Sequence, residues 1–383
     1  MMLEIAKLGD ISKNIQTGPF GSQLHQSDYS ECGTPVVMPK DLVGGKISEE
    51  SIARVDKTHV ERLCRHKIEV GDILYSRRGD VGRCAHVTKK EEGWLCGTGC
   101  LRVTIDSEKA DSRFVFFQLQ HPDTVGWVEK HAVGATMLNL NTTILSSVPI
   151  RLPALEIQKR IADILSAYDD LIENNQKQIK LLEEAAQRLY KEWFVDLRFP
   201  GHENTKIVDG VPEGWSRTNI NGILTFHRGY DLTKNEMKAG RYPVVGSTTV
   251  IGYHNEFKIK GPGIVTGRSG SLGKYQFIWD NFWPHNTSLY ISDYKDHNIF
   301  FVYSLLQTVD FASLNNGGAI PTLNRNVLSN IEVIEPTDEL QEMFAKIAEP
   351  QYQKIKNLEK QNNQLKMARD ALLPKLMSGE VEV

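Results

Sequence analysis

The sequence predicts an α+β protein in which two mixed α/β domains are separated by two long helices that form an antiparallel coiled coil with pseudo-twofold symmetry. Three observations predict this fold class: a residue pattern that recurs far along the chain, two long stretches with helical periodicity, and short strand-like segments before each stretch. The recurrence has a far longer period than the roughly 20–50 residues of solenoid repeats. It therefore indicates two tandem copies of one domain-plus-helix unit.

The repeat is defined by identical residues that recur 183 positions later in the chain, as Asn141 does at Asn324. The coinciding pairs include Gly134 and Gly317, Leu145 and Leu328, Pro153 and Pro336, Glu156 and Glu339, and Gln158 and Gln341. We divide the chain into a first domain (1–153), a first helix (154–195), a linker (196–214), a second domain (215–336) and a second helix with a tail (337–383). A protein with two similar domains is suited to a target that also has two halves.

Each domain is predicted to contain more strand than helix. In the first domain, Val70–Arg83 alternates apolar residues and then turns, which is typical of a hairpin. Gly261–Lys274 repeats this pattern at an offset of 191, so loop lengths differ between the copies. Aromatic-rich stretches at 112–128 and 297–314 are predicted to be helical.

The first long helix is expected from Ala154 onward, because the segment contains neither glycine nor proline and its apolar residues step by threes and fours. Its heptad core positions are Ile161, Leu165, Tyr168, Ile172, Asn175, Ile179, Leu182, Ala186, Leu189 and Trp193. The same frame in the second helix gives Phe344, Ala348, Gln351, Ile355, Leu358, Asn362, Leu365, Arg369, Leu372 and Leu376. This second seam is more polar, and we expect Pro350 to kink or restart the helix.

Two asparagines in these seams predict the register. An antiparallel pairing that places Asn175 opposite Asn362 keeps the other core layers aligned, as the repeat offset requires. A buried asparagine pair specifies register at some cost in stability. The alternative is that both side chains lie near water and have no such role.

Composition excludes some function classes. The chain of 383 residues is 40% hydrophobic and 24% charged, which is ordinary for a globular protein. It has no apolar run of about 20 residues and no secretory signal at its start, so we expect a cytoplasmic protein without membrane contact. Its net charge of −3 argues against a simple basic DNA binder, and any DNA contact must depend on local clusters.

All five cysteines lie in the first domain, and an odd number suits reduced thiols better than a disulfide framework. Cys84 and His86 followed by Cys96 and Cys100 could be drawn as a zinc site. The spacing matches no tight ligand pattern, and the second domain has no counterpart. We therefore expect no metal, and interpret these cysteines as small buried hydrophobic residues.

Polar residues clustered at the predicted hairpins are the candidates for DNA contact. Arginine suits guanine, asparagine suits adenine, and lysine and serine commonly contact phosphates. The candidates are Lys40, Arg77, Arg78, Arg83 and Asn141 in the first domain, and Arg228, Arg268, Ser269, Ser271, Lys274, Asn286, Thr287 and Arg325 in the second. The alternative is that these are ordinary solvent-facing charges, but the recurrence of the cluster in both domains favours a shared role.

A catalytic constellation is missing from the sequence. It has no dinucleotide-binding glycine fingerprint, no phosphate-binding loop of the Walker type and no Asn/Asp-Pro-Pro-aromatic box. Asp231 with Glu236 and Lys238 only loosely resembles a nuclease carboxylate–lysine set. We expect no catalytic residue and no bound cofactor. The alternatives are a self-sufficient nuclease or methyltransferase, and a coiled-coil scaffold that binds proteins.

Several blocks resemble those of the DNA-specificity subunits of Type I restriction–modification systems. These are ILSSVPIRLPALEIQKRIADIL, YKEWFVDLRFPGHE, VPEGW and RDALLPKLMSGEVEV, and the resemblance extends over essentially the whole chain. It implies a non-catalytic subunit whose two target-recognition domains each read one half of a bipartite, asymmetric site in double-stranded DNA. It also implies that two methyltransferase subunits dock on the long helices, with restriction subunits as further partners. S-adenosylmethionine, ATP and Mg would then be bound by the partner subunits.

Overall fold

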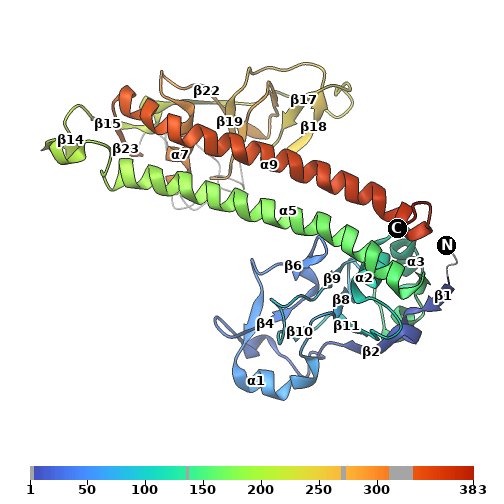
Figure 1. The fold of residues 1–383 in the computed structure, drawn as a ribbon. Helices are drawn as coiled ribbons and strands as arrows, with labels where there is room; N and C mark the ends of the chain where they lie inside the picture. The colour runs from blue at the N-terminus through green and yellow to red at the C-terminus, as the bar shows by residue number, and fades with distance from the viewer. Residues whose placement is uncertain (1–3, 135–137, 269–272, 310–330) are drawn as a thin grey trace. The chain divides into compact units, whose positions relative to one another are not determined.

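A computed structural model describes residues 4–134, 138–268, 273–309 and 331–383. The chain forms two compact units, of which unit 1 comprises Met1–Asn174 with Gln361–Val383 and unit 2 comprises Asn175–Lys360. Each unit contains a globular part and one portion of each long helix (Figure 1). We name these globular parts head 1 (residues 4–153) and head 2 (residues 215–336).

Head 1 is built on two four-stranded sheets and two two-stranded pairings. The first sheet has the order β2 (Ser12–Thr17), β11 (Cys100–Ile105), β8 (Ile73–Ser76), β9 (Cys84–His86), all antiparallel. The second has the order β10 (Leu95–Cys96), β4 (Thr34–Val37), β7 (Ala53–Val55), β3 (Tyr29–Ser30), with β10 parallel to β4. The two pairings are β1 (Glu4–Lys7) with β12 (Pro149–Leu152), and β5 (Leu42–Val43) with β6 (Lys46–Ile47).

Head 2 repeats this plan in its described residues. Its first sheet has the order β16 (Thr225–Arg228), β22 (Ser288–Asp293), β19 (Gly263–Gly267), β20 (Tyr275–Ile278), again antiparallel. Its second has the order β18 (Val250–His254), β17 (Tyr242–Val245), β21 (Trp283–Pro284), with β21 parallel to β17. β15 (Ser216–Asn219) pairs with β23 (Glu332–Glu335) as β1 pairs with β12. The predicted internal repeat is therefore confirmed for the first sheet, for the pairing of β15 with β23 and for the parallel contact in the second sheet. Among the described residues of head 2, β3 and the pairing of β5 with β6 have no counterpart.

The helices of the heads differ from the predicted stretches at one point. Head 1 contains α1 (Lys57–Arg62), α2 (Ser112–Gln120), α3 (Pro122–His131) and α4 (Thr142–Ser146); head 2 contains α6 (Ile220–Ile223) and α7 (Ile299–Thr308). The stretch 112–128 is helical as predicted, but it is divided at His121 into α2 and α3. Pro122 forces His121 into an extended conformation, and the His121 ring then accepts a hydrogen bond from the Asp123 backbone amide at 3.2 Å to start α3. Residues 310–314 of the second stretch lie outside the described residues.

The two long helices are α5 (Leu155–Tyr190) and α9 (Asp338–Ser378), and they run antiparallel within each unit. In unit 1, Ile161 near the start of α5 shares a core cluster with Leu376 near the end of α9. In unit 2, Ala186 near the end of α5 shares a cluster with Phe344 and Ala348 near the start of α9. The predicted heptad seam is thus the face that the structure buries.

Pro350 neither ends nor restarts the second helix, because α9 continues through it; this part of the prediction is wrong. Proline removes the hydrogen bond to the carbonyl four residues earlier, that of Lys346. Both residues lie on the exposed face, where water can satisfy that carbonyl. On the opposite face, Phe344, Ala348 and Ile355 pack into the core and hold the helix together.

The seam asparagines are both buried, at 5% exposure each. The Asn362 side-chain amide donates to the Ile172 carbonyl at 3.4 Å, within unit 1. Arg369, another polar seam residue, forms an ion pair with Asp169 of α5. Polar seam residues are therefore partnered inside unit 1, while the pairing of Asn175 with Asn362 stays a prediction.

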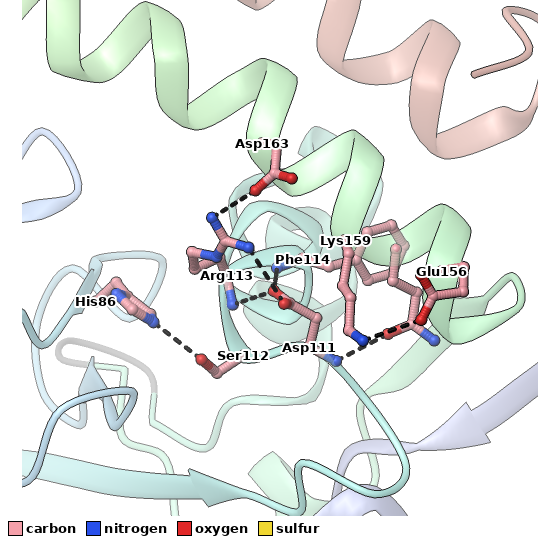
Figure 2. A network of polar contacts seen from close by, with 9 residues as sticks. His86, Asp111, Ser112, Arg113, Phe114, Glu156, Lys159 and Asp163 are labelled. Carbon is pink, nitrogen blue, oxygen red and sulfur yellow. Dashed lines mark hydrogen bonds and ion pairs between the residues drawn. The ribbon is translucent and has the colours of Figure 1, made fainter.

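A buried glutamine fastens head 1 to α5. Gln158 accepts a hydrogen bond from the Asp111 backbone amide at 3.0 Å and donates to the Pro153 carbonyl at 2.8 Å. Asp111 is also the residue that caps α2, since its carboxylate accepts from two backbone amides of the first turn. Next to it, Arg113 of α2 donates to Asp163 of α5 at 2.8 Å (Figure 2).

Gln341 makes the same fastening in unit 2. It accepts from the Asn298 backbone amide at 3.2 Å and donates to the Pro336 carbonyl at 3.2 Å. Asn298 caps α7 as Asp111 caps α2. The glutamine and proline that coincide in the sequence repeat are therefore the residues that fix each head on its long helix.

The segment between α5 and head 2 is structured. α5 is followed by a π-helical turn over Lys191–Val195, a 3-10 turn over His202–Asn204, and a hairpin of β13 (Ile207–Val208) and β14 (Val211–Pro212). Phe199 is buried and its ring lies 4.9 Å from that of Trp215. Among the described residues, no helix is both long and apolar enough to cross a membrane.

Candidate nucleic-acid interface

One edge of the antiparallel sheet in head 1 gathers most of the predicted contact residues. Three backbone hydrogen bonds define this edge. They run from Gly18 to the Cys100 carbonyl at 2.9 Å, from Arg77 to the Gly99 carbonyl at 2.7 Å, and from Gly97 to the Val37 carbonyl at 2.9 Å. Together they tie the end of β2, the end of β8 and the loop between β10 and β11 to one another.

Head 2 reproduces the same three bonds. They run from Gly229 to Ser288 at 3.0 Å, from Arg268 to Thr287 at 3.1 Å, and from His285 to Val245 at 2.9 Å. We call this set of bonds the frame. It makes Gly229 the counterpart of Gly18, Arg268 the counterpart of Arg77, and the loop 285–287 the counterpart of the loop 97–99.

Two glycines of the frame, Gly18 and Gly229, occupy equivalent positions where the backbones approach closely. A Cβ atom on Gly18 would lie 2.0 Å from the Gly97 carbonyl oxygen, and one on Gly229 would lie 2.1 Å from the His285 carbonyl oxygen. Real Cβ atoms do not come this near to a backbone oxygen. Glycine therefore lets the strand end and the loop touch in both heads.

In head 1, two neighbouring arginines at the frame differ in burial. Arg77 is half-buried: its Nε donates to the Leu140 carbonyl at 3.2 Å, and its guanidinium lies 5.7 Å from the centre of the Phe20 ring. Arg78 is exposed and its backbone bridges to Asn139. Arg77 is thus partly committed to structure, while the Arg78 side chain extends into solvent.

The remaining candidates of head 1 lie around this edge. Arg83, on the strand opposite Ser76, is exposed and pairs with Asp80 at 2.7 Å. Lys40 follows Pro39, which lies against Gly99, and donates to the Ser51 carbonyl at 2.8 Å. These residues therefore carry more positive than negative charge, which favours binding of a polyanion such as DNA.

Asn141 has a structural role that the sequence prediction did not include. Its side-chain oxygen accepts a hydrogen bond from the Ile144 backbone amide at 2.8 Å and caps α4. The cap uses one oxygen lone pair and leaves the amide group available. The structure therefore places Asn141 beside Arg77 but does not single it out as a contact residue.

In head 2, the frame carries a different set of side chains. Arg228 lies 3.9 Å from Asp231, and the Asn286 amide donates to the same carboxylate. The Thr287 carbonyl also accepts from the Ser247 hydroxyl at 2.7 Å. The predicted residues Arg228, Arg268, Asn286 and Thr287 are thus brought together by hydrogen bonds and one ion pair.

Lys274 is exposed, and its carbonyl accepts from Thr266 at 3.0 Å, as the counterpart of Arg83 across the hairpin. The other three candidates of head 2 cannot be placed. Ser269, Ser271 and Arg325 lie outside the described residues.

The loosely nuclease-like residues of head 2 serve other purposes. The Glu236 carboxylate accepts from the Thr233 backbone amide at 2.9 Å, and this hydrogen bond keeps its pKa below the usual value. The Lys238 backbone amide donates to the His254 ring at 3.0 Å. Within the described ranges, no group of three or more His, Cys, Asp or Glu side chains is placed to hold a metal ion.

The cysteines drawn as a possible zinc site are buried in head 1. Burial raises the pKa of the Cys84 and Cys96 thiols to about 12, so both stay protonated at neutral pH. Cys84 packs in the main core of the unit and Cys96 in a second cluster with Cys100.

Sequence reasoning missed the residues whose placement depends on the frame. Phe20, Thr98 and His285 lie at the interface edge but had not been assigned to it. The loops GTGC and HNTS share no residue at equivalent positions, so only the strand pairings on either side reveal that they correspond.

Comparisons with known proteins agree with this geometry. The family described as the Type I restriction modification DNA specificity domain matches residues 3–184 and 212–367. The chain is similar to the Type I restriction enzyme MjaIX specificity subunit of Methanocaldococcus jannaschii, with 27% identity over 383 residues, covering 91% of this chain and 87% of that protein. It is also similar to the Type I restriction enzyme HindI specificity subunit of Haemophilus influenzae, with 28% identity over 193 residues, covering 49% of this chain and 40% of that protein.

The fold is similar to a solved structure. The crystal structure of the Type-I restriction-modification system S subunit from M. genitalium superposes with a TM-score of 0.65 and 19% identity, covering 98% of this chain and 96% of the other. The two-copy architecture of this chain is therefore a known arrangement.

Proposed function

The chain belongs to the family of Type I restriction–modification DNA specificity domains, and from this premise we propose that it is the subunit that selects the DNA sequence for such a system. Each head reads one half of a bipartite, asymmetric site in double-stranded DNA. Catalysis resides in partner subunits. The long helices are where two methyltransferase subunits dock, and restriction subunits join where the system has them.

The observation that carries this proposal is the frame itself. Two sheets with the same topology present an arginine at the same position, Arg77 in head 1 and Arg268 in head 2, within loops of different chemistry. Arginine is the side chain best suited to bidentate contact with guanine in the major groove. A shared frame with divergent loops is what a reader of two unlike half-sites requires.

The distribution of charge supports the same proposal. A net charge of −3 gives the chain no general attraction to DNA, so binding depends on the cationic edge of each head and on the partners. S-adenosylmethionine, ATP and Mg belong, in this proposal, to the partner subunits.

Co-expression with the methyltransferase subunit of such a system tests the proposal. We expect N6-methyladenine to appear in host DNA at a new motif of two short specific blocks around an unread gap. The matched control is the methyltransferase subunit expressed without this chain, which should leave host DNA unmodified. A soluble, co-purifying complex that adds no methylation would contradict the proposal and favour a protein-binding scaffold.

A further inference from the structure

Two chemically different residues stand two positions after the shared glycine of the frame in the two heads. Phe20 follows Gly18 by two residues and Asp231 follows Gly229 by two residues, while both glycines hold the same backbone contact. Both side chains are accessible: Phe20 is 51% exposed and the Asp231 side chain is 81% exposed. One position of the interface therefore carries an aromatic ring in head 1 and a carboxylate in head 2.

Phe20 is held in place by its backbone and by a neighbouring cation. Its amide donates to the Gln23 side chain at 3.2 Å, and its carbonyl accepts from the Gln23 amide at 2.8 Å. The Arg77 guanidinium lies 5.7 Å from the centre of its ring. An exposed phenylalanine fixed beside the arginine of the frame offers an apolar surface to whatever that arginine contacts.

Asp231 is oriented by two neighbours. Arg228 lies 3.9 Å away, and the Asn286 amide donates to its carboxylate. A carboxylate at a DNA-binding edge is repelled by phosphates, so its favourable position is opposite a hydrogen-bond donor on a base. In the major groove, cytosine N4 is the donor that carboxylates typically contact.

We propose that this position determines specificity in both heads, with Phe20 contacting a thymine methyl group in one half-site and Asp231 accepting a hydrogen bond from cytosine N4 in the other. The inference rests on the proposed function and deepens it, because it assigns the base class read at one position of each half-site. Phenylalanine suits the thymine methyl group for the same reason that aspartate suits cytosine: each matches the chemistry of that base edge.

The test uses the complete complex with its methyltransferase subunits. Methylation motifs are determined by sequencing host DNA, and binding of the purified complex is measured on duplexes that carry each base at each specified position. We expect Asp231→Ala to lose its preference for cytosine at one position of one half-site by about 5- to 150-fold, with the other half-site unchanged. Phe20→Ala should lose a preference for thymine in the opposite half-site by a similar factor.

Glu236→Gln is the matched control, since it neutralises an exposed carboxylate of the same loop whose partner is Thr233. It should leave both half-sites unchanged. If Asp231→Ala and Phe20→Ala leave every base preference intact, or weaken all duplexes equally, the inference is overturned while the proposed function stands. If the unsubstituted complex itself shows no sequence preference, it is the proposed function that fails.

Where Asp231→Ala abolishes methylation, the duplex panel still decides, because it reports relative affinity without catalysis. Asp231→Asn is the conservative variant for that measurement, since asparagine retains the shape and suits adenine instead. A shift of preference from cytosine towards adenine supports the proposal. An unchanged preference for cytosine overturns it.

Discussion

Head 1 and head 2 share a backbone frame but fill it with different side chains. The loop of head 1 is Gly97-Thr98-Gly99, whereas the loop of head 2 is His285-Asn286-Thr287, and both close the frame through the same hydrogen bonds. Those bonds involve backbone atoms alone, and Gly18 and Gly229 are the glycines whose close contact is shared by both heads. The fold of a head therefore leaves its interface residues free to diverge.

A second difference lies beneath the interface. Ile73 pairs with His86 in head 1, and Ile264 pairs with Phe277 at the corresponding place in head 2. The His86 ring lies 5.7 Å from Phe116, and the Phe277 ring lies 5.2 Å from Tyr303. The two heads therefore share this strand pairing, but the position holds a titratable histidine in head 1 and a phenylalanine in head 2.

The largest expected effect comes from breaking the frame in one head at a time. Gly18→Ala and Gly229→Ala should each destabilise their own head by about 3 kcal/mol or more, because the new Cβ meets a backbone oxygen that cannot move alone. Hydrogen exchange of β2 and β11 compared with β16 and β22 measures this. Gly21→Ala is the control, since its Cβ would meet nothing within 4 Å. Undiminished protection in either variant would contradict the close approach.

Removing the fastening glutamines should have the next largest effect. Gln158→Leu leaves the Asp111 amide and the Pro153 carbonyl without their partner, which costs about 2–3 kcal/mol. Protection of α2 against hydrogen exchange should fall while that of α7 stays, and Gln341→Leu should do the reverse. Gln176→Leu, at an exposed position of α5, serves as the control. Equal losses in both helices would mean that the heads are not fastened separately.

Replacing the arginine of the frame in each head tests whether the two interfaces read separate half-sites. Arg77→Ala and Arg268→Ala should each reduce discrimination at one half-site by about 1–3 kcal/mol, with the opposite half-site unaffected. Competition binding between matched and mismatched duplexes measures this. Lys89→Ala removes an exposed cation of head 1 that pairs with Glu92, and should change nothing. Uniform weakening on all duplexes would mean that the arginines contact phosphate only.

The smallest expected effect is a pH dependence of folding stability that arises from His86 in head 1. Burial lowers the pKa of His86 to about 4, below the value of about 6.5 in an unfolded chain. The unfolded state therefore takes up the proton first, so the stability of head 1 is complete above about pH 6.5 and falls as pH drops towards 4. His86→Phe, which copies head 2, should gain about 1–2 kcal/mol relative to the parent chain between pH 7.5 and 5. Thermal melts at both pH values measure it, and a pH-independent difference would exclude the assignment.

The sequence predicted the features that depend on periodicity. The offset of 183 residues and the heptad positions identified both long helices and the buried seam, since each periodic residue reports directly on one face. The fastening by Gln158 and Gln341 was visible as a coincidence of residues, but its purpose needed the contacts to Asp111 and Asn298. Helix continuity through Pro350 was not predictable, because packing of the opposite face outweighs the local preference.

The interface was predicted in part. The arginines of the hairpins were found because Arg77 and Arg268 recur within a similar pattern. Phe20 and Asp231 were not recognised as equivalent, because their equivalence rests on backbone hydrogen bonds of the frame and on no shared residue except the glycine. Side-chain divergence at this position is what hides it from sequence comparison.

The central claim is that each head reads its half-site independently within a shared frame. The most direct measurement is to replace Met1–Ile150 with the corresponding segment of a relative of different specificity, co-express the hybrid with the methyltransferase subunit, and sequence the methylated host DNA. We expect a motif in which one half changes and the other is retained. A change in both halves would contradict it.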